Sequence, residues 1–378
     1  MARKDKDEMT IEERREYRKN RRIRNQILAY LSLVLLLVCI GIGGFYGVKF
    51  LINKVSGIVS QGNDVPTVSD DSVSQDQFVM SSDGMGAGVI STPEEIVEPE
   101  VTEPEVVECE EARNYINAMS LEDKVAAMFI VSPEDVTEVD RVTAAGEQVK
   151  AAVDEYGMGG IIFTDNNITS AEQFAEMLST AQGYYQTTYN NTMWLAYNGA
   201  SAADYKDSGI NMTITTADSF ALGSSGVLDC VTLFPFPDGV GADSLDESID
   251  DMRETRFAAF NTAVNSGADA IILSNAKLTA VEDLPASLSY AVITETLRND
   301  MGFDGVIITG FMDEDAITGN YSAGEAALKA VNAGADIILC SDDFYAAYDE
   351  VLTAVQSGEI PESRIDESLM RIYTAKYQ

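Results

Sequence analysis

The chain has 378 residues, of which 62 are Asp or Glu and 25 are Lys or Arg, giving a net charge of −37 at pH 7. A body with this much negative charge repels nucleic acid and anionic lipid, and we therefore expect no nucleic acid partner. The sequence contains no histidine, and its four cysteines show no CxxC or other metal-ligand spacing. We therefore predict neither a metal site nor a cofactor. Cys230 and Cys340 lie in apolar runs and are expected to be buried free thiols.

The N-terminal segment predicts a membrane anchor. The run ILAYLSLVLLLVCIGIGGFYG at Ile27–Gly47 carries no charge and is long enough to cross a hydrocarbon core of about 30 Å as a helix. Arginine and lysine are frequent before it, and such positive charge keeps that end of an anchor in the cytoplasm. We expect a basic cytoplasmic tail at 1–25, a single transmembrane anchor at 26–49 in the cell membrane, and an extracellular body. A cleaved signal peptide is the alternative, but its apolar run is usually about 7–15 residues long.

Residues 50–111 are expected to form a disordered acidic linker. Ser, Asp, Glu, Val, Pro and Gly dominate this segment, and no Lys or Arg occurs between Lys54 and Arg113. Low apolar content and like charge oppose a packed core, while self-repulsion and proline keep such a chain extended. The linker would hold the body away from the membrane.

The remaining residues, 112–378, alternate short apolar runs with longer amphipathic ones. Near-continuous apolar strands, each followed by a helix, are typical of a parallel sheet with covered faces. The expected strands are Met128–Ser132, Gly160–Thr164, Met193–Tyr197, Met212–Thr215, Cys230–Phe234, Ala270–Ser274, Val306–Thr309 and Ile337–Cys340. The expected helices are Ala144–Tyr156, Ala171–Tyr185, Leu245–Ser266, Ala291–Met301, Ser322–Asn332, Phe344–Gln356 and Glu362–Tyr377. The number and size of these units predict an α/β fold, a (β/α)8 TIM-type barrel. A doubly wound open sheet is the alternative on pattern alone.

Several phrases in this body resemble the family 3 glycoside hydrolases, and within them the β-N-acetylhexosaminidases. The longest is PASLSYAVITETLRNDMGFDGVIITGFMDEDAI at Pro285–Ile317. Further phrases that resemble family segments are MSLEDKVAAMFIV (Met119–Val131), GMGGIIFTDNN (Gly157–Asn167), GINMTITTAD (Gly209–Asp218) and RIDESLMRI (Arg364–Ile372). The resemblance covers most of Ala118–Lys376 and implies a glycoside hydrolase barrel, although these phrases carry no chemistry themselves.

The resemblance also marks the positions of the family's catalytic groups, and both are substituted. The family has an Asp nucleophile after the Thr or Ser that ends the strand following "GFDGVI", whereas here Thr309 is followed by Gly310. The family's acid/base is the last His of a loop of the form KHFPGHG…DSH, which aligns without a gap with TLFPFPDGVGADSL at Thr232–Leu245. Leu245 therefore stands at the acid/base position. Glycine cannot attack carbon and leucine cannot transfer a proton, so the resemblance implies a barrel that has lost its chemistry.

Four positions correspond to substrate-binding or mouth positions of the family. Thr232 replaces a Lys of the loop above, and Phe236 replaces a small or polar residue at the barrel mouth. Asn198 lies in AYNGAS, where the family has DQEGG, and Asn275 stands where the fifth strand of the family closes with "AH". We take Thr232, Asn198, Asn275 and Phe236 as the candidate substrate-binding residues.

Other carboxylates lie near the missing catalytic groups. Asp313, Glu314 and Asp315 follow Gly310 by three to five residues, and Asp238 and Asp243 lie on the loop that ends at Leu245. A pair such as Asp243 with Asp313 could act as acid and base on a water molecule, as in an inverting mechanism. Acidic loop positions also arise by composition in so acidic a chain, and Asp243 then remains as a hydrogen-bonding residue of its loop.

Two functions follow from these observations. In the first, the protein is a membrane-anchored, extracytoplasmic, family 3-like domain that is degenerate and binds a cell-wall glycan or an envelope protein. In the second, it is an active glycosidase that removes terminal N-acetylhexosamine from cell-wall glycans with substituted carboxylates. The loss of both catalytic groups favours the first function.

Overall fold

The structure of the protein, a computed structural model, describes residues 109–199, 205, 207–221, 226–340 and 343–377, all within the compact unit Val101–Gln378. The predicted tail and anchor and almost all of the predicted linker lie outside the described residues. Helix α2 (Glu110–Ala118) begins inside the predicted linker, so its last two residues, Glu110 and Glu111, are helical. Within the described ranges, no helix combines the length and the apolarity that crossing a bilayer requires.

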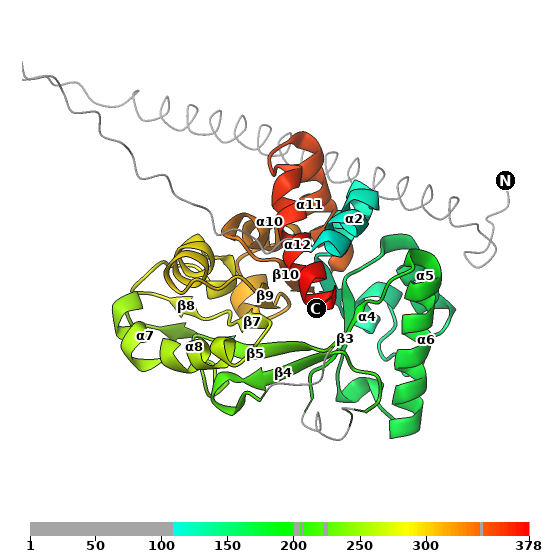
Figure 1. Ribbon diagram of the computed structural model, residues 1–378, viewed down its shortest axis with the longest axis horizontal. Coiled ribbons are helices and arrows are strands. Elements are labelled where there is room, and N and C mark those ends of the chain that lie inside the picture. Colours follow the sequence, from blue (N-terminus) through cyan, green and yellow to red (C-terminus); the bar gives the residue numbers. More distant parts are fainter. Residues whose placement is uncertain (1–108, 200–204, 206, 222–225, 341–342, 378) are drawn as a thin grey trace, which may run out of the picture. The chain divides into compact units, whose positions relative to one another are not determined.

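The body is a closed barrel of eight parallel strands, as the sequence predicts (Figure 1). The strands are β1 (Phe129–Val131), β2 (Gly160–Phe163), β3 (Trp194–Tyr197), β4 (Met212–Thr216), β5 (Leu228–Phe234), β7 (Ala270–Leu273), β9 (Val306–Phe311) and β10 (Ile337–Cys340). Their order around the ring is β1-β10-β9-β7-β5-β4-β3-β2. Each predicted strand overlaps an observed one, and closure of the ring excludes the open doubly wound sheet.

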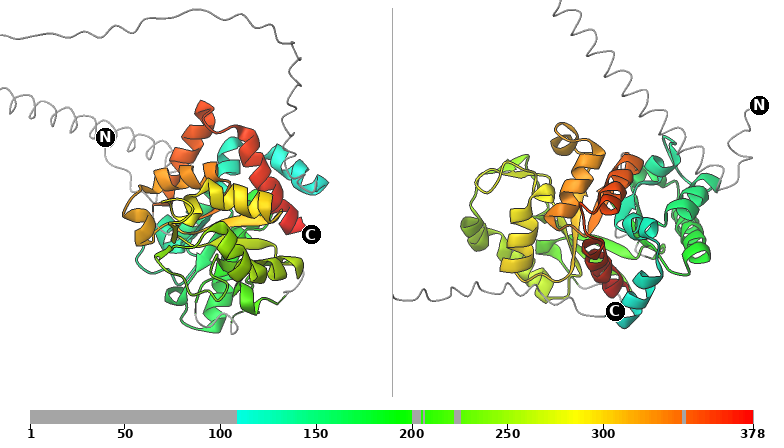
Figure 2. Two further views of the ribbon diagram at one scale, coloured as in Figure 1. Left: turned by 90° about the vertical axis from the view of Figure 1, so that its left-hand side faces the viewer. Right: turned by 90° about the horizontal axis from the view of Figure 1, so that it is seen from above.

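Helices surround the strands (Figures 1 and 2). The longer ones are α3 (Leu121–Ala126), α5 (Glu147–Tyr156), α6 (Ala171–Tyr189), η6 (Ala291–Asp300), α10 (Ala323–Ala333), α11 (Phe344–Ser357) and α12 (Glu362–Tyr377), with short α4 (Pro133–Thr137) and α9 (Asp315–Thr318) on connections. Single turns occur at η2 (Asp165–Asn167), η4 (Ala217–Ser219) and η5 (Ala286–Leu288). Local chemistry sets their ends: the Ser120 side chain accepts from the Asp123 N–H at 3.1 Å at the start of α3, and Gly334 ends α10 at φ 111°, a conformation that favours glycine.

One predicted helix, Leu245–Ser266, is wrong in its first part. Ser244–Leu245 forms strand β6, which pairs in parallel with β8 (Lys277–Leu278) in a separate two-stranded sheet. The helical part begins after Ser248, whose side chain accepts from the Asp251 N–H at 3.2 Å, and is broken at Arg256 into α7 (Ile249–Thr255) and α8 (Phe257–Asn265). The pairing partner of β6 is more than thirty positions away, so the local pattern carries no sign of it.

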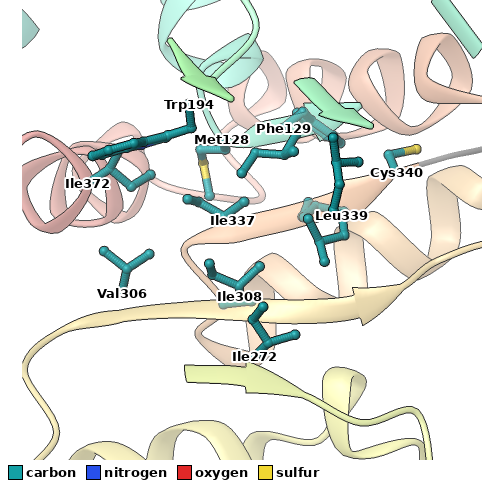
Figure 3. Packing of buried hydrophobic residues seen from close by; sticks show 14 of the residues in the cluster. Met128, Phe129, Trp194, Ile272, Val306, Ile308, Ile337, Leu339, Cys340 and Ile372 are labelled. Atoms are coloured by element: carbon teal, nitrogen blue, oxygen red, sulfur yellow. The ribbon is translucent and has the colours of Figure 1, made fainter. Parts of the chain in front are cut away.

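Apolar side chains from facing strands fill the barrel. Figure 3 shows Met128, Ile337 and Ile308 meeting between the strands, with Trp194 beside Ile372 of α12. All of these are at most 3% exposed. Cys230 and Cys340 are buried free thiols, as predicted. Such an interior is a packed core and holds no channel.

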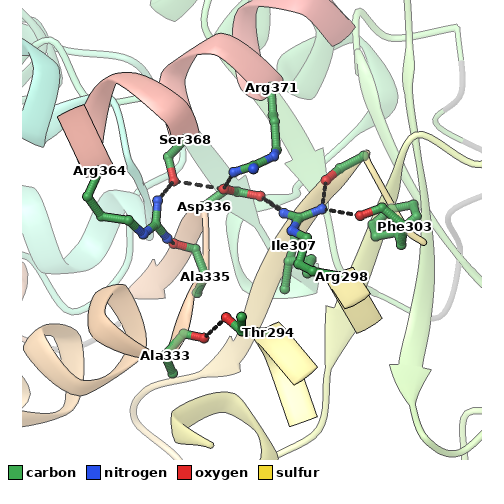
Figure 4. A network of polar contacts seen from close by, with 11 residues as sticks. Thr294, Arg298, Phe303, Ile307, Ala333, Ala335, Asp336, Arg364, Ser368 and Arg371 are labelled. Atoms are coloured by element: carbon green, nitrogen blue, oxygen red, sulfur yellow. Dashed lines mark hydrogen bonds and ion pairs between the residues drawn. The ribbon is translucent and has the colours of Figure 1, made fainter. Parts of the chain in front are cut away.

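Charged residues from the family-like phrases bind one another in the scaffold (Figure 4). Asp336, at the start of β10, is fully buried and forms ion pairs with Arg298 of η6 and, at 3.1 Å, with Arg371 of α12. Asp336 also accepts from Ser368 at 2.7 Å, and Ser368 accepts from Arg364 at 2.6 Å. The phrases TLRNDMGFDGVI and RIDESLMRI therefore contain the arginines that hold one buried carboxylate. Their function here is structural.

Candidate functional site at the C-terminal rim of the barrel

Three neighbouring strands, β5, β7 and β9, bring the predicted site residues to one arc of the rim. All strands of the barrel are parallel, so the loops that follow these three leave at the same end, where barrel enzymes carry their chemistry. The β6–β8 pairing ties the loop after β5 to the loop after β7. The Asn275 side chain ties the loop after β7 to the end of β9.

Gly310, at the predicted nucleophile position, lies near the end of β9 and is packed against Asn275. A Cβ atom on Gly310 would lie 2.8 Å from Nδ2 of Asn275 and 2.9 Å from its Cγ and Oδ1. The backbone N–H of Gly310 donates to Ser287 Oγ at 2.8 Å. The amide of Asn275 therefore fills the space that the Cβ atom of a nucleophilic residue at position 310 would need.

Asn275 is held firmly in this place. Its side chain is buried, and Nδ2 donates to the Phe311 carbonyl at 2.7 Å and to Glu314 Oε2 at 3.1 Å. These two acceptors fix the orientation of the amide. Oδ1 is buried and has no hydrogen-bond partner among the described residues, so one acceptor of the amide is unsatisfied. Asn275, predicted as a substrate-binding residue, thus lies against the predicted nucleophile position.

Glu314, rather than Asp313, is the carboxylate that reaches this centre. Glu314 is exposed at the rim, but its carboxylate is partly enclosed by the loops around Asn275. This burial raises the pKa of Glu314, the hydrogen bond from Asn275 lowers it, and the charge of Asp313 raises it again, with a net rise. Asp313 itself is exposed. The sequence placed three acidic residues here, and only the Asn275 contact distinguishes Glu314 from the other two.

Leu245, at the predicted acid/base position, lies in the β6–β8 ribbon. It is half-buried, packs on the core and pairs with Leu278, and its carbonyl accepts from the Thr279 N–H at 3.0 Å. Asp243 is exposed one residue before the ribbon, and its carbonyl accepts from the Lys277 N–H at 3.0 Å. The β6–β8 ribbon thus holds the loop in which an acid/base was predicted to be replaced, and the side chain at the predicted position is apolar.

The other predicted site residues are distributed around the rim. Asn198 is exposed after β3, and Thr232 is half-buried in β5, where the Thr232–Leu233 and Phe234–Pro235 peptide bonds are cis. Phe236 is only 4% exposed, with the Arg256 guanidinium carbon 5.3 Å from its ring centroid. The Phe236 ring is thus enclosed by protein, with Arg256 over it. The substrate-binding roles of these residues stay predictions.

Asp238 belongs to a different group of charges. It is exposed, and its carboxylate accepts from the Val240 N–H at 3.0 Å. Arg256 is bound by Glu247 through two hydrogen bonds of 2.9 and 3.0 Å, and Glu247, with a smaller contribution from Asp238, raises the pKa of Arg256. Asp238 therefore acts on Arg256, whereas Asp313 acts on Glu314. In the described part of the chain, no three acidic, cysteine or histidine side chains converge as metal ligands.

Part of this chain is similar in sequence to known proteins. Residues 236–375 match the glycosyl hydrolase family 3 N terminal domain. An uncharacterized secreted glycosyl hydrolase of Arthroderma benhamiae is 30% identical over 184 residues, 43% of this chain and 51% of that protein. A β-hexosaminidase of Hydrogenovibrio crunogenus is 32% identical over 149 residues, 37% of this chain and 42% of that protein. The chain thus spans about half or less of the length of these curated relatives.

Solved structures show the same fold. The family 3 β-N-acetylglucosaminidase of a Paenibacillus species superposes with a TM-score of 0.60 at 24% identity, over 69% of this chain and 62% of that one. At 24% identity, this structural similarity shows the fold alone, and the relation to the family rests on the sequence matches. These matches support a glycoside hydrolase family 3 domain of the β-hexosaminidase type over the matched part of the barrel.

Proposed function

We propose that this protein is a degenerate family 3 barrel that binds N-acetylglucosamine-containing wall glycans at the cell surface without cleaving them. One observation carries the proposal: the amide of Asn275 fills the space at Gly310 where a nucleophile would stand. Retaining hydrolysis needs a carboxylate nucleophile and an acid/base about 5–5.5 Å apart. Gly310 and Leu245 supply neither group.

Binding without cleavage has support from the polar groups left at the rim. Asn275 Oδ1 is a buried acceptor without a partner among the described residues, and Glu314 adds carboxylate oxygens beside it. Sugar hydroxyls and acetamide N–H groups are donors that match such acceptors. The acidic body repels phosphate-rich polymers, so a neutral glycan suits it better. An envelope protein is the alternative occupant.

The location belongs to the same proposal. The apolar run at 26–49, with the basic segment before it, anchors the chain in the cell membrane with the barrel outside. Protease added to intact cells is expected to release a fragment that contains the barrel. Protection of the barrel in intact cells, together with cleavage after lysis, would contradict this orientation.

The decisive experiment measures turnover and binding on the same preparation. The full chain in detergent is incubated with an aryl N-acetylglucosaminide and, separately, titrated calorimetrically with soluble wall fragments. We expect no turnover above the uncatalysed rate, and saturable binding of the fragments that weakens in Asn275→Ala. Turnover by the unmodified protein, or an absence of binding, contradicts the proposal.

A second candidate, an active glycosidase, is favoured by one observation. Burial raises the pKa of Glu314, and a carboxyl with a raised pKa is suited to donating a proton near neutral pH. The matched test is Glu314→Gln beside Asp315→Asn, an exposed acidic residue next to it. Turnover that falls about 10²–10⁴-fold in the first variant, and persists in the second, would establish Glu314 as the acid/base.

Restoring the family residues tests the blocking role of Asn275. In Gly310→Asp with Leu245→His both catalytic groups return, but Asn275 still occupies the space at position 310. We expect this double variant to remain inactive. Activity in the double variant, without any change at Asn275, would show that the amide yields its place readily and does not block the site.

A further inference from the structure

A pocket lies at the opposite end of the barrel from the rim residues. It has a volume of about 470 Å³ and is lined by Gln186, Asn190, Asn191, Thr192, Lys376 and Tyr377. Thr192 stands just before β3, whereas Gly310 stands near the end of β9. Because the strands are parallel, the two sites belong to opposite ends. The lining is rich in amide and hydroxyl groups, and Lys376 is its one charged side chain.

The amine of Lys376 is enclosed by protein, although part of the residue reaches solvent. Nζ donates to the Thr192 carbonyl and lies 4.8 Å from the Trp194 ring centroid and 5.0 Å from that of Tyr373. Within the described residues, no carboxylate forms an ion pair with it. Burial lowers the pKa of Lys376 to about 7. About half of this amine is therefore uncharged at neutral pH, against about 0.04% for an ordinary lysine with pKa about 10.4.

Several tyrosines lie at and behind this pocket, and Glu111 and Cys109 act on one of them, Tyr377. Tyr373, Tyr377, Tyr115 and Tyr185 all have pKa values raised by burial and are neutral at pH 7. The Tyr377 hydroxyl accepts from Asn191 Nδ2 at 2.8 Å, which leaves its own proton free to be donated into the pocket. The pocket thus combines a desolvated amine, a proton donor and two aromatic faces that stabilise a cation.

We propose that this pocket is a ligand site for a small aldehyde, which Lys376 captures as a Schiff base. A desolvated lysine amine is the usual nucleophile for carbonyl carbons. The nitrogen lone pair forms a bond to the carbonyl carbon, and the nitrogen passes a proton to the oxygen. The resulting hydroxyl takes up a second proton and leaves as water, so that a protonated carbon–nitrogen double bond remains. The Trp194 and Tyr373 rings face this cation.

The test uses the full chain in detergent with propanal as the probe. Sodium cyanoborohydride traps the Schiff base as a propyl amine, and peptide mass spectrometry gives the rate at each lysine. Lys329 is the internal control, because its amine also lies over a tyrosine ring, 5.6 Å from the Tyr321 centroid, but on an exposed side chain. At pH 7 we expect Lys376 to react at least tenfold faster than Lys329, with a rate that saturates as propanal increases.

Two outcomes overturn the proposal. If Lys376 is labelled no faster than Lys329, its amine is not unusually reactive. If its labelling is fast but the rate stays strictly proportional to the propanal concentration, the pocket does not bind the aldehyde. Trp194, the single tryptophan of the chain, supplies a second readout without reductant. Its emission is expected to change saturably with propanal in the unmodified protein and to stay constant in Lys376→Arg. If Lys376→Arg fails to fold, the comparison of the two lysines in the unmodified protein still decides.

Discussion

The pH dependence of folding offers a direct test of the buried amine of Lys376. Burial lowers its pKa from 10.5 to about 7. Below pH 7 both the folded and the unfolded chain carry the proton, and the folded state bears the full cost of a buried charge. Between pH 7 and 10.5 the unfolded chain binds more protons than the folded one. The free energy of unfolding must therefore rise with pH in this interval.

The size of the effect follows from the two pKa values. One pKa unit corresponds to about 1.4 kcal/mol, and integration of the proton difference from pH 6 to 8.5 gives a rise of about 2 kcal/mol. Few other groups interfere in this window, because the chain contains no histidine. Burial raises the pKa of Cys230 above its usual 9.0. As pH rises, Cys230 therefore loses its proton in the unfolded chain before it does so in the folded one. This lowers the free energy of unfolding and opposes the rise from Lys376, but only at higher pH.

Urea unfolding at pH 6, 7, 8 and 8.5, followed by Trp194 fluorescence, measures this rise. The single tryptophan reports on the barrel alone, since it lies in β3. The control is Lys376→Met, which keeps an unbranched chain over the Trp194 ring and removes the charge. We expect the unfolding free energy of the control to be flat across the window. A flat or falling curve for the unmodified protein would refute an uncharged Lys376 at neutral pH.

Three further changes test the scaffold and the rim. Asp336→Asn removes the buried carboxylate that pairs with Arg298 and Arg371, so we expect the free energy of unfolding in urea to fall by about 3–5 kcal/mol. The control is Asp315→Asn at an exposed position, which should change this free energy by no more than about 0.5 kcal/mol. Gly310→Ala places a methyl group against Asn275 and should lower the free energy of unfolding by about 1–3 kcal/mol. In a double-mutant cycle, most of this loss should vanish when Asn275→Ala is already present. Full additivity of the two changes would contradict the close packing. Ser322→Ala removes a capping box at the start of α10 and should lower the free energy of unfolding by about 1 kcal/mol. An unchanged Tm in calorimetry would contradict this contribution of the cap.

The strands were predictable because their signal is local. A buried parallel strand is a continuous apolar run, and runs such as Ala270–Ser274 or Ile337–Cys340 are visible without any partner. Helix ends were predictable for the same reason: Gly334 and Gly358 adopt φ values of 111° and 80° at the positions where the apolar periodicity stops. Closure of the ring was not local, because the same pattern also allows a doubly wound open sheet, and the pairing of β1 with both β2 and β10 closes the barrel.

The assignment of Gly310 and Leu245 to the family's catalytic positions comes from the sequence, because a motif fixes position along the chain, and it stays a prediction. The motif does not say what fills the space that a lost side chain leaves. That Asn275 packs on Gly310, and that Glu314 rather than Asp313 binds Asn275, depends on side chains from two loops meeting across the rim. The strand at Ser244–Leu245 likewise depends on its distant partner Lys277–Leu278.

The sequence by itself determined the alternation of strands and helices, the family likeness and the prediction that Gly310 and Leu245 stand at catalytic positions, because each of these rests on apolar periodicity or on contiguous motifs. The tertiary structure decided the properties that depend on surroundings. Nothing in the last helix sets Lys376 apart from other lysines, and its amine becomes unusual only where Thr192, Trp194 and Tyr373 enclose it. A pKa depends on the solvent and charge around a group, and those are properties of packing between segments far apart in the chain.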